Sequence, residues 1–445
     1  MIQEIPRPCS AIEDLTSAST TELLIRSGVS AVILNWSRFE NVVLIVSGLC
    51  DPSLRDVVSE IIVSRLRIVN SPENLYFQAR FIACSAATFK YCFIQDDDYF
   101  VRPEVIRTLH SRIRLTGIPK SIHLLPPHEH LSSASLTGYS LDGRIHTRFA
   151  WVGHGTMMHR ELSESFLALM DDLNFSSEER KMADNYFTLL RNDFTEIWHD
   201  QGIELGGGQP FTVGTEGEQR NRLHIGNALA YLDEHLGSSR GHPYVLQDTQ
   251  SRLPRERDYA VCLGRTCLLS ASLPGSLGDT AHQVGVAKDL LLMVANSSIV
   301  TGSLESGLSR AADADPKTYF ESKQDAQVGD FFTLDLTGQV GPLDQGKNAE
   351  IALLVDAATA DLLHGAQVDH SPDEGQWSPP VTQPSCHKLE LYGGELTECC
   401  FRLRGDVSSA RHLRVTLKNL KEKAPWRIHE IWARASSAKT VVNVA

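Results

Sequence analysis

The chain has 445 residues, and its formal net charge at pH 7 is −13. A single hydrophobic core rarely serves more than ~250–300 residues, so this length predicts two domains. The negative charge argues against nucleic acid or an anionic membrane as a partner. The longest apolar run near the N-terminus is Val42–Val46, whereas a bilayer span needs ~20 residues, so we expect no membrane segment here.

The first part of the chain predicts strands that alternate with helices. Helices are expected from Asn41 to about Cys50 and from Asn74 to Thr88. Alternation of this kind indicates a parallel sheet, which binds ligands beyond the C-terminal ends of its strands. The apolar runs expected as strands are Val29–Trp36, Ser59–Val63, Leu66–Val69 and Tyr91–Gln95.

Three consecutive carboxylates, Asp96, Asp97 and Asp98, follow the last of these strands. Residues two apart on a strand point the same way, so Asp96 and Asp98 can face one ligand. Carboxylate oxygens suit Mg²⁺ and similar cations, whose shell substrate phosphates then complete. A solvated acidic turn is the structural alternative. The order of the neighbouring segments favours the metal site.

That order resembles the GT-A fold of nucleotide-sugar glycosyltransferases, and in particular its exostosin-like branch. The matching segments lie within residues 29–225, about half of the chain: VILNWSR, EIIV, NSPENLYFQARF, FIQDDDYF, GHGTMMHR (153–160) and ADNYF (183–187). The resemblance implies an α/β domain with a Rossmann-like mixed sheet flanked by helices. It also implies metal-dependent transfer of a hexosyl or N-acetylhexosaminyl group from a nucleotide-diphosphate sugar, such as a UDP-sugar, to a glycan or other hydroxyl acceptor.

The resemblance assigns the cation and the donor to named residues. Asp98 would hold Mn²⁺ or Mg²⁺ beside the donor diphosphate, with Asp96 and His224 as further metal ligands. The residues that would bind the nucleotide sugar are Arg38, Asn74, Arg80, Asp96 and Asp97. Structural roles are the alternatives: Arg80 as a surface helical arginine, Asn74 as a helix-start residue that serves the backbone, and His224 as a structural hydrogen-bonding group.

Catalytic roles follow in the same way. Asp184 would lie beside the reacting anomeric carbon, where a carboxylate can act as a base toward the acceptor hydroxyl or stabilise positive charge. Arg220 and Arg222, in a polar stretch expected to be a mobile loop, would close over the diphosphate and offset its charge. The family often shows paired acids where this chain has Asp184-Asn185, which leaves the second position without an assigned role. The alternative for Asp184 is an acid that stabilises a helix N-terminus.

The second half predicts a different architecture. Residues 236–256 are polar and contain Gly and Pro, which indicates a linker or a strap. Beyond them, short apolar runs without clear helices between them predict an all-β sandwich. The expected strands are Tyr259–Leu263, Leu290–Ala295, Phe331–Leu336, Ile351–Val355, Lys388–Tyr392, Cys400–Leu403, Leu413–Leu417 and Ile428–Trp432.

Segments such as ADADPKTYFES and PWRIHEIWAR are similar to discoidin-type jelly rolls. That resemblance implies a carbohydrate-binding domain, with Trp377 and His364 as candidate contacts and packing as the alternative for Trp377. We therefore expect a GT-A domain over residues 1–248 and a β-sandwich over residues 255–445.

The nine cysteines show no zinc-ligand spacing. Cys262 could pair with Cys267, and Cys386 with Cys399 or Cys400, in an oxidising lumen. No signal peptide is visible. The family resemblance implies the Golgi or secretory lumen if an N-terminal anchor was trimmed, and the cytoplasm is the alternative.

Two classes of function stay open. One is an active glycosyltransferase, which the intact acidic run favours. The other is a lectin-like carbohydrate-binding protein whose transferase domain is vestigial. A two-metal nuclease or phosphatase is disfavoured, because no second cluster of acids and histidine follows a comparable strand.

Overall fold

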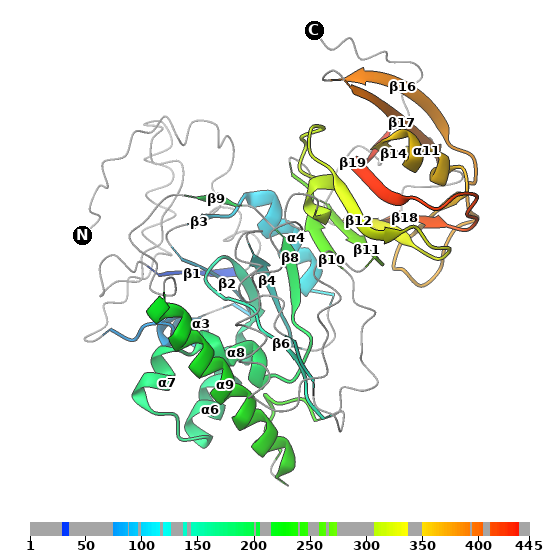
Figure 1. Ribbon diagram of the computed structural model, residues 1–445. Helices are drawn as coiled ribbons and strands as arrows, with labels where there is room; N and C mark the ends of the chain where they lie inside the picture. Colours follow the sequence, from blue (N-terminus) through cyan, green and yellow to red (C-terminus); the bar gives the residue numbers. More distant parts are fainter. Residues whose placement is uncertain are drawn as a thin grey trace, which may run out of the picture.

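An α/β part is followed along the chain by a β-rich part (Figure 1). The computed structural model describes residues 29–34, 74–87, 89–96, 99–115, 119–125, 137–139, 144–199, 202–204, 215–238, 241–247, 258–263, 267–273, 307–336, 349–391, 394–403 and 410–435. The coarse fold class expected from the sequence, α/β followed by a β-sandwich, agrees with this arrangement.

The α/β part is built on a mixed sheet. Its strands are β1 (Val29–Leu34), β2 (Tyr91–Asp96), β7 (Thr156–His159), β4 (Ser121–Leu125) and β8 (Glu196–His199), in that spatial order. The pairs β1–β2 and β4–β8 are parallel, whereas β7 is antiparallel to both β2 and β4. Two short ribbons pair β3 (Tyr99–Phe100) with β9 (Ile203–Glu204), and β5 (Thr137–Tyr139) with β6 (His146–Arg148).

Helices cover both faces of this sheet. One face packs against α4 (Pro103–Ile113), which buries Val105 and Leu109 on Phe93 of β2. The helices that contribute to the core on the other face are α3 (Gln78–Ser85), α6 (Arg160–Asp172), α8 (Asp184–Leu190) and α9 (Thr215–Gly237), with the short α7 (Ser177–Lys181) between α6 and α8. None of the helices in the described residues combines the length and apolar character needed to cross a membrane.

Helix α3 is shorter than the sequence predicted, and its position is tightly fixed. The Asn74 side chain accepts the Tyr76 N–H at 2.9 Å, and Tyr76 has a φ of 47°, so the helix starts only at Gln78. A disulfide joins Cys84 on α3 to Cys92 on β2. The expected helix at 41–50 and the expected strands at 59–63 and 66–69 lie outside the described residues.

The polar stretch after α9 contains a strap over residues 241–247, one of the two alternatives expected from its composition. Tyr244 is buried in the core of the α/β part, and its hydroxyl donates to the Phe187 carbonyl. The Arg191 guanidinium donates to the Tyr244 carbonyl and thereby closes the strap onto the end of α8. This segment therefore belongs structurally to the first part.

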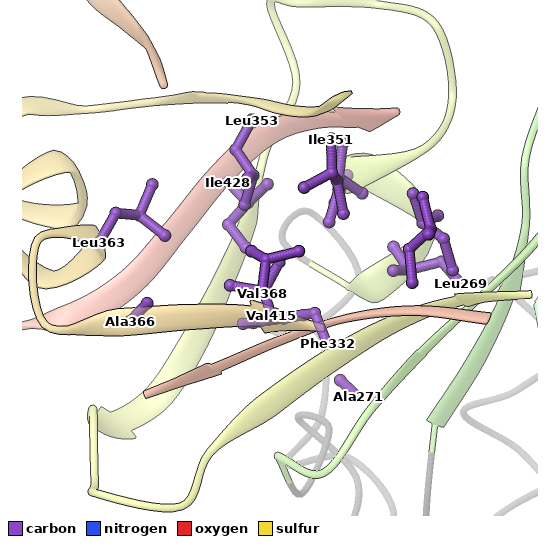
Figure 2. Close-up of a cluster of buried hydrophobic side chains, with 14 of the residues drawn as sticks. Leu269, Ala271, Phe332, Ile351, Leu353, Leu363, Ala366, Val368, Val415 and Ile428 are labelled. Carbon is purple, nitrogen blue, oxygen red and sulfur yellow. The ribbon is translucent and has the colours of Figure 1, made fainter. Parts of the chain in front are cut away.

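The β-rich part consists of two packed sheets. One has the order β12-β19-β14-β17-β16, and the other contains β11-β13-β18-β15. Figure 2 shows their shared core, in which Leu269 and Phe332 from the second sheet lie opposite Ile351, Leu353 and Ile428 from the first. The strands are β10 (Asp258–Val261), β11 (Leu268–Ala271), β12 (Phe320–Asp325), β13 (Phe331–Asp335), β14 (Ala349–Val355), β15 (Ala366–Ser371), β16 (Ser385–Leu391), β17 (Gly394–Arg402), β18 (His412–Leu417) and β19 (Pro425–Ala435).

The expectation of no helix between these strands is wrong. Helix α11 (Ala357–Leu363) follows β14, and the Asp356 side chain caps it by accepting the Thr359 N–H at 2.8 Å. Leu362 and Leu363 bury themselves in the sandwich core, which stabilises a helix too short to persist alone. The expected strand at 290–295 lies outside the described residues.

A single ten-stranded sheet runs through both parts of the chain. Strand β10 pairs in parallel with β8 and forms a hairpin with β11, and the Cys262–Cys267 disulfide closes this hairpin. Val261 and Leu268 face the core under α4, whereas Ala260 and Leu269 face the sandwich core. The division at residues 248 and 255 stays a prediction, and it assigns this shared hairpin to the second domain.

We expect replacement of Cys262 and Cys267 by Ser to lower the free energy of unfolding by about 2 kcal/mol, because the disulfide closes a short loop. Replacement of Cys386 and Cys399, which close a longer loop between β16 and β17, should cost about 3 kcal/mol. Urea denaturation of both double variants measures the difference. A larger loss from the shorter loop would contradict this ranking and would show that the hairpin has a stabilising role beyond loop closure.

Candidate functional site

Arg80 joins two carboxylates that are far apart in the sequence. Its Nη1 lies 2.5 Å from Asp184 Oδ2, and its Nη2 lies 2.8 Å from Asp96 Oδ1. Arg80 comes from α3, Asp96 ends β2 and Asp184 begins α8. Residues 16 and 104 positions from Arg80 are thus held on one guanidinium group. The structure brings together three of the residues that the sequence singled out.

This cluster is an electrostatic exception in the core. Arg80 is 0% exposed and Asp184 is 1% exposed, and a buried charge is tolerated only when partners surround it. One guanidinium and two ionised carboxylates would leave one negative charge in excess. Of the two carboxylates, Asp96 is the one that solvent reaches, because its side chain is 17% exposed. The C-terminal end of β2 is therefore suited to a positively charged ligand.

Burial raises the pKa of Asp184 to about 7, and the nearby Asp96 charge raises it further, while Arg80 and the Val152 N–H oppose the shift. The order of these effects means that desolvation outweighs the ion pair. A carboxyl that titrates near neutral pH is well suited to accept a proton from a hydroxyl and to release it again.

Gly153 makes room for Asp96. Its carbonyl accepts the Asp96 N–H at 2.7 Å, and a Cβ at this position would lie 2.0 Å from Asp96 Oδ2. The glycine belongs to the GHGTMMHR segment, one of the segments that carry the family resemblance, for which no contact was predicted. The structure shows that its first residue borders the acidic end of β2.

Helix α9 packs on the start of α8. Asn185 Nδ2 donates to Asn221 Oδ1 at 3.3 Å, and the Tyr186 hydroxyl is 2.7 Å from His224 Nδ1. Burial is the main cause that lowers the His224 pKa, so the imidazole is neutral at pH 7. His224 thus contacts Tyr186 of α8, which gives it a structural role. Its predicted role as a metal ligand remains untested.

The expectation that Arg220 and Arg222 lie in a mobile loop is wrong. Both belong to α9, where their side chains are half-buried. The Arg220 charge contributes to the lowered His224 pKa, which places this arginine near the α8–α9 contact. The two arginines can still contribute positive charge, but from a fixed helix.

The other sequence-predicted residues divide into two groups. Arg38, Asp97 and Asp98 lie outside the described residues. The Asn74 side chain accepts the Tyr76 N–H, which agrees with the structural alternative of a residue that serves the backbone at the helix start. No group of three or more His, Cys, Asp or Glu side chains suited to a metal is found among the residues that the structure describes, a set that excludes Asp97 and Asp98.

The candidate carbohydrate contacts of the sandwich differ from each other. The Arg414 guanidinium lies 3.6 Å from the centre of the Trp377 ring, and Asp369 binds that guanidinium in turn. One face of the indole is therefore covered by protein, which favours the packing role. His364 follows α11 and is exposed.

A shallow recess lies at the N-terminal ends of β4 and β8. It is lined in part by Ser121 and Glu196, the first residues of β4 and β8, together with Lys120 and Arg191. Because β2 and β4 run in the same direction, this recess is at the end opposite Asp96. It does not belong to the Arg80 site.

Comparisons with known proteins add little. No family model matches the chain, and no curated protein matches it. One similar solved structure is a Bacteroides thetaiotaomicron protein described as "putative chitobiase, fragment 298-461". It is 15% identical, covers 31% of this chain and 80% of its own, and has a TM-score of 0.18. A TM-score this low supports no conclusion about fold or function.

We expect Gly153→Ala to destabilise the protein by about 1–3 kcal/mol, because the added methyl group overlaps the Asp96 carboxylate and forces it or the backbone to move. The matched control is Gly226→Ala in α9, where a Cβ would meet no atom within 4 Å. That control should stabilise the helix by about 0.5–1 kcal/mol. Thermal denaturation that showed equal effects for both variants would refute the tight Gly153–Asp96 contact.

The Asp184 pKa predicts a pH-dependent stability. The folded protein keeps the Asp184 proton up to pH about 7, whereas the unfolded chain releases it near its ordinary value of 3.8. The folded state therefore binds more protons between these values, so its stability falls as pH rises. Relative to Asp184→Asn, we expect the wild-type free energy of unfolding to decline from pH about 4 to about 7. Urea denaturation curves that keep a constant difference would contradict the raised pKa.

Proposed function

We propose that this protein is a metal-dependent glycosyltransferase that moves a sugar from a nucleotide-diphosphate sugar, in the first instance a UDP-sugar, to a glycan or other hydroxyl acceptor. The observation that carries the proposal is the Arg80 bridge between Asp96 and Asp184. The sequence resemblance assigned donor and catalytic roles to these residues separately. Their meeting in one buried cluster is what a single reaction centre requires.

The place of the cluster supports the proposal. Asp96 is the last residue of β2, in a mixed sheet covered by helices on both faces. Ligands of open α/β sheets bind beyond the carboxyl ends of the strands. The mixed order, with β7 antiparallel between β2 and β4, is consistent with the GT-A arrangement that we propose for this part.

The chemistry assigns separate tasks to the two carboxylates. Asp98 and Asp96 would hold the cation, with Asp97 at the nucleotide sugar, and carboxylate oxygens are the ligands that Mn²⁺ and Mg²⁺ prefer. When bound, the cation would offset the negative charge that builds on the leaving diphosphate. Asp184 would accept the proton of the acceptor hydroxyl, for which its raised pKa is suited. Arg80 would hold both carboxylates in register.

The disulfides indicate an oxidising compartment. The described residues contain the pairs Cys84–Cys92, Cys262–Cys267 and Cys386–Cys399, while Cys400 is a buried free thiol. Disulfides persist in oxidising environments and are rare in the cytosol. We therefore propose the Golgi or secretory lumen as the place where the protein acts.

The test is a screen of UDP-sugars for Mn²⁺-dependent hydrolysis and transfer. We expect Asp98→Asn to lower turnover by about 100-fold or more, because the cation loses a charged ligand, and EDTA to act likewise on the wild type. Asp184→Ala should keep UDP binding and lose turnover, since its carboxylate acts on the transition state. Asp361→Asn, at an exposed position on α11, is the control for loss of a carboxylate.

Two outcomes would count against the proposal. Full activity in EDTA would refute metal dependence. Glycan binding without any turnover, by a wild type that binds no UDP-sugar, would favour the lectin-like alternative, to which the β-sandwich would then contribute the binding site.

A further inference from the structure

A histidine side chain holds the strap over residues 241–247 in its closed conformation. The Tyr244 N–H donates to His242 Nδ1 at 3.1 Å, and the Val245 N–H donates to the His242 carbonyl at 3.1 Å. The second bond closes a β-turn with Pro243 at its second position, where proline is favoured. Because a backbone N–H can only donate, His242 Nδ1 carries no proton here and the imidazole is neutral.

The closed strap reaches the core of the α/β part through Tyr244. The Tyr244 hydroxyl donates to the carbonyl of Phe187, a residue of α8. The Phe187 ring lies 4.8 Å from the ring of Phe81 on α3, measured between centroids. The strap therefore supports the two helices that carry Arg80 and Asp184, and its release would affect more than a surface loop.

Three titratable or charged groups face the strap histidine or its neighbours. Asp172, at the end of α6, places Oδ2 3.6 Å from His242 Nε2, beyond hydrogen-bond distance, and its side chain is 70% exposed. His235, in the last turn of α9, has a buried Nε2 that makes no hydrogen bond with any residue that the structure describes. Arg191 donates to two carbonyls of the strap. Of these groups, only Asp172 attracts a positive charge on His242, and solvent weakens that attraction.

Burial is the largest effect on both histidines, and it lowers the pKa of His242 and of His235 below the ordinary value of 6.5. The Asp172 charge opposes both shifts, whereas the charge of His242 lowers the His235 pKa further. The unfolded chain therefore binds more protons than the folded chain below pH about 6.5. The stability that the neutral histidines contribute is complete above that pH and falls as the pH decreases.

We propose that the strap is an acid-sensitive latch, which neutral His242 keeps closed by accepting the Tyr244 N–H and which protonation of Nδ1 releases. A proton on Nδ1 turns the acceptor into a donor, so it would point at the Tyr244 N–H and the hydrogen bond would be lost. The turn that directs Tyr244 into the core would then lose its side-chain support. The latch does not depend on the proposed function, because it involves no ligand.

The experiment is hydrogen exchange of the full chain at about pH 7.5 and about pH 5.5, corrected for the intrinsic pH dependence of amide exchange. Mass spectrometry follows a peptide that contains residues 241–247 and, as the reference, a peptide from β14 in the sandwich. We expect protection of the strap to fall about fivefold or more at the lower pH, because loss of one hydrogen bond favours local opening by about that factor. The β14 peptide should keep its protection.

A substitution can remove the titration and keep the acceptor. An asparagine side chain accepts the N–H two residues further along the chain, so His242→Asn can still bind the Tyr244 N–H. We expect this variant to protect the strap equally at both pH values. His387→Asn, at an exposed position of β16, is the matched control and should keep the wild-type response. His235→Gln should also keep a response, because His242 still titrates.

Four results would overturn the latch. Equal protection of the wild-type strap at both pH values would refute it, and stronger protection at the lower pH would show that the His242–Asp172 pair closes the strap instead. A full response in His242→Asn, or its disappearance in His235→Gln, would assign the pH dependence to another group. Parallel loss of protection in β14 would show that the whole chain unfolds.

Discussion

The structure of the first part depends on how one buried guanidinium is neutralised. Arg80 is fully buried and therefore needs a carboxylate partner, and it has two, Asp96 and Asp184; losing both would leave an uncompensated charge in the core. This requirement fixes α3, the end of β2 and the start of α8 relative to one another. The Cys84–Cys92 disulfide strengthens one of these connections, because it joins α3 directly to β2. Packing of Phe81 on Phe166 and Phe187, at ring distances of 4.9 and 4.8 Å, then holds α3 against α6 and α8.

The neutralised arginine also explains why the site combines rigidity with an available carboxylate. Both terminal nitrogens of Arg80 donate to carboxylates. The guanidinium therefore orients the Asp96 and Asp184 side chains and is not a free binding group for a phosphate from solvent. Burial at the same time raises the pKa of Asp184 to about 7, so this carboxyl can exchange a proton near neutral pH. Gly153 contributes by having no side chain at the place that the Asp96 carboxylate occupies. The site is thus defined by the contacts of Arg80 with Asp96 and with Asp184 and by the contact of Gly153 with Asp96. A single strand–helix unit could not provide all three.

The sequence predicted what local patterns encode and missed what depends on distant partners. Strand β2 and the β-sandwich strands β13, β14, β18 and β19 followed from short apolar runs with turns between them. The reversed direction of β7 and the Cys84–Cys92 pair depend on contacts between elements, and no periodicity reveals them. Helix α11 was missed because seven residues give too little pattern, although Asp356 at its start was a usable capping signal. Arg220 and Arg222 were assigned to a loop because the polar run before them hid the start of α9. Asn221 carried no signal at all, since only the fold brings it to Asn185.

The β10–β11 hairpin has a consequence for how this protein could have been assembled. A module joined by a flexible linker can be exchanged for another module with little effect on its neighbour. Here the hairpin supplies Val261 and Leu268 to one core and Ala260 and Leu269 to the other, within one continuous hydrogen-bonded sheet. Any replacement of the sandwich by recombination would have to bring a strand that pairs with β8 and fills the space beneath α4. The two halves are therefore expected to have diverged as a unit, with the orientation of the sandwich set by strand register and not by linker length.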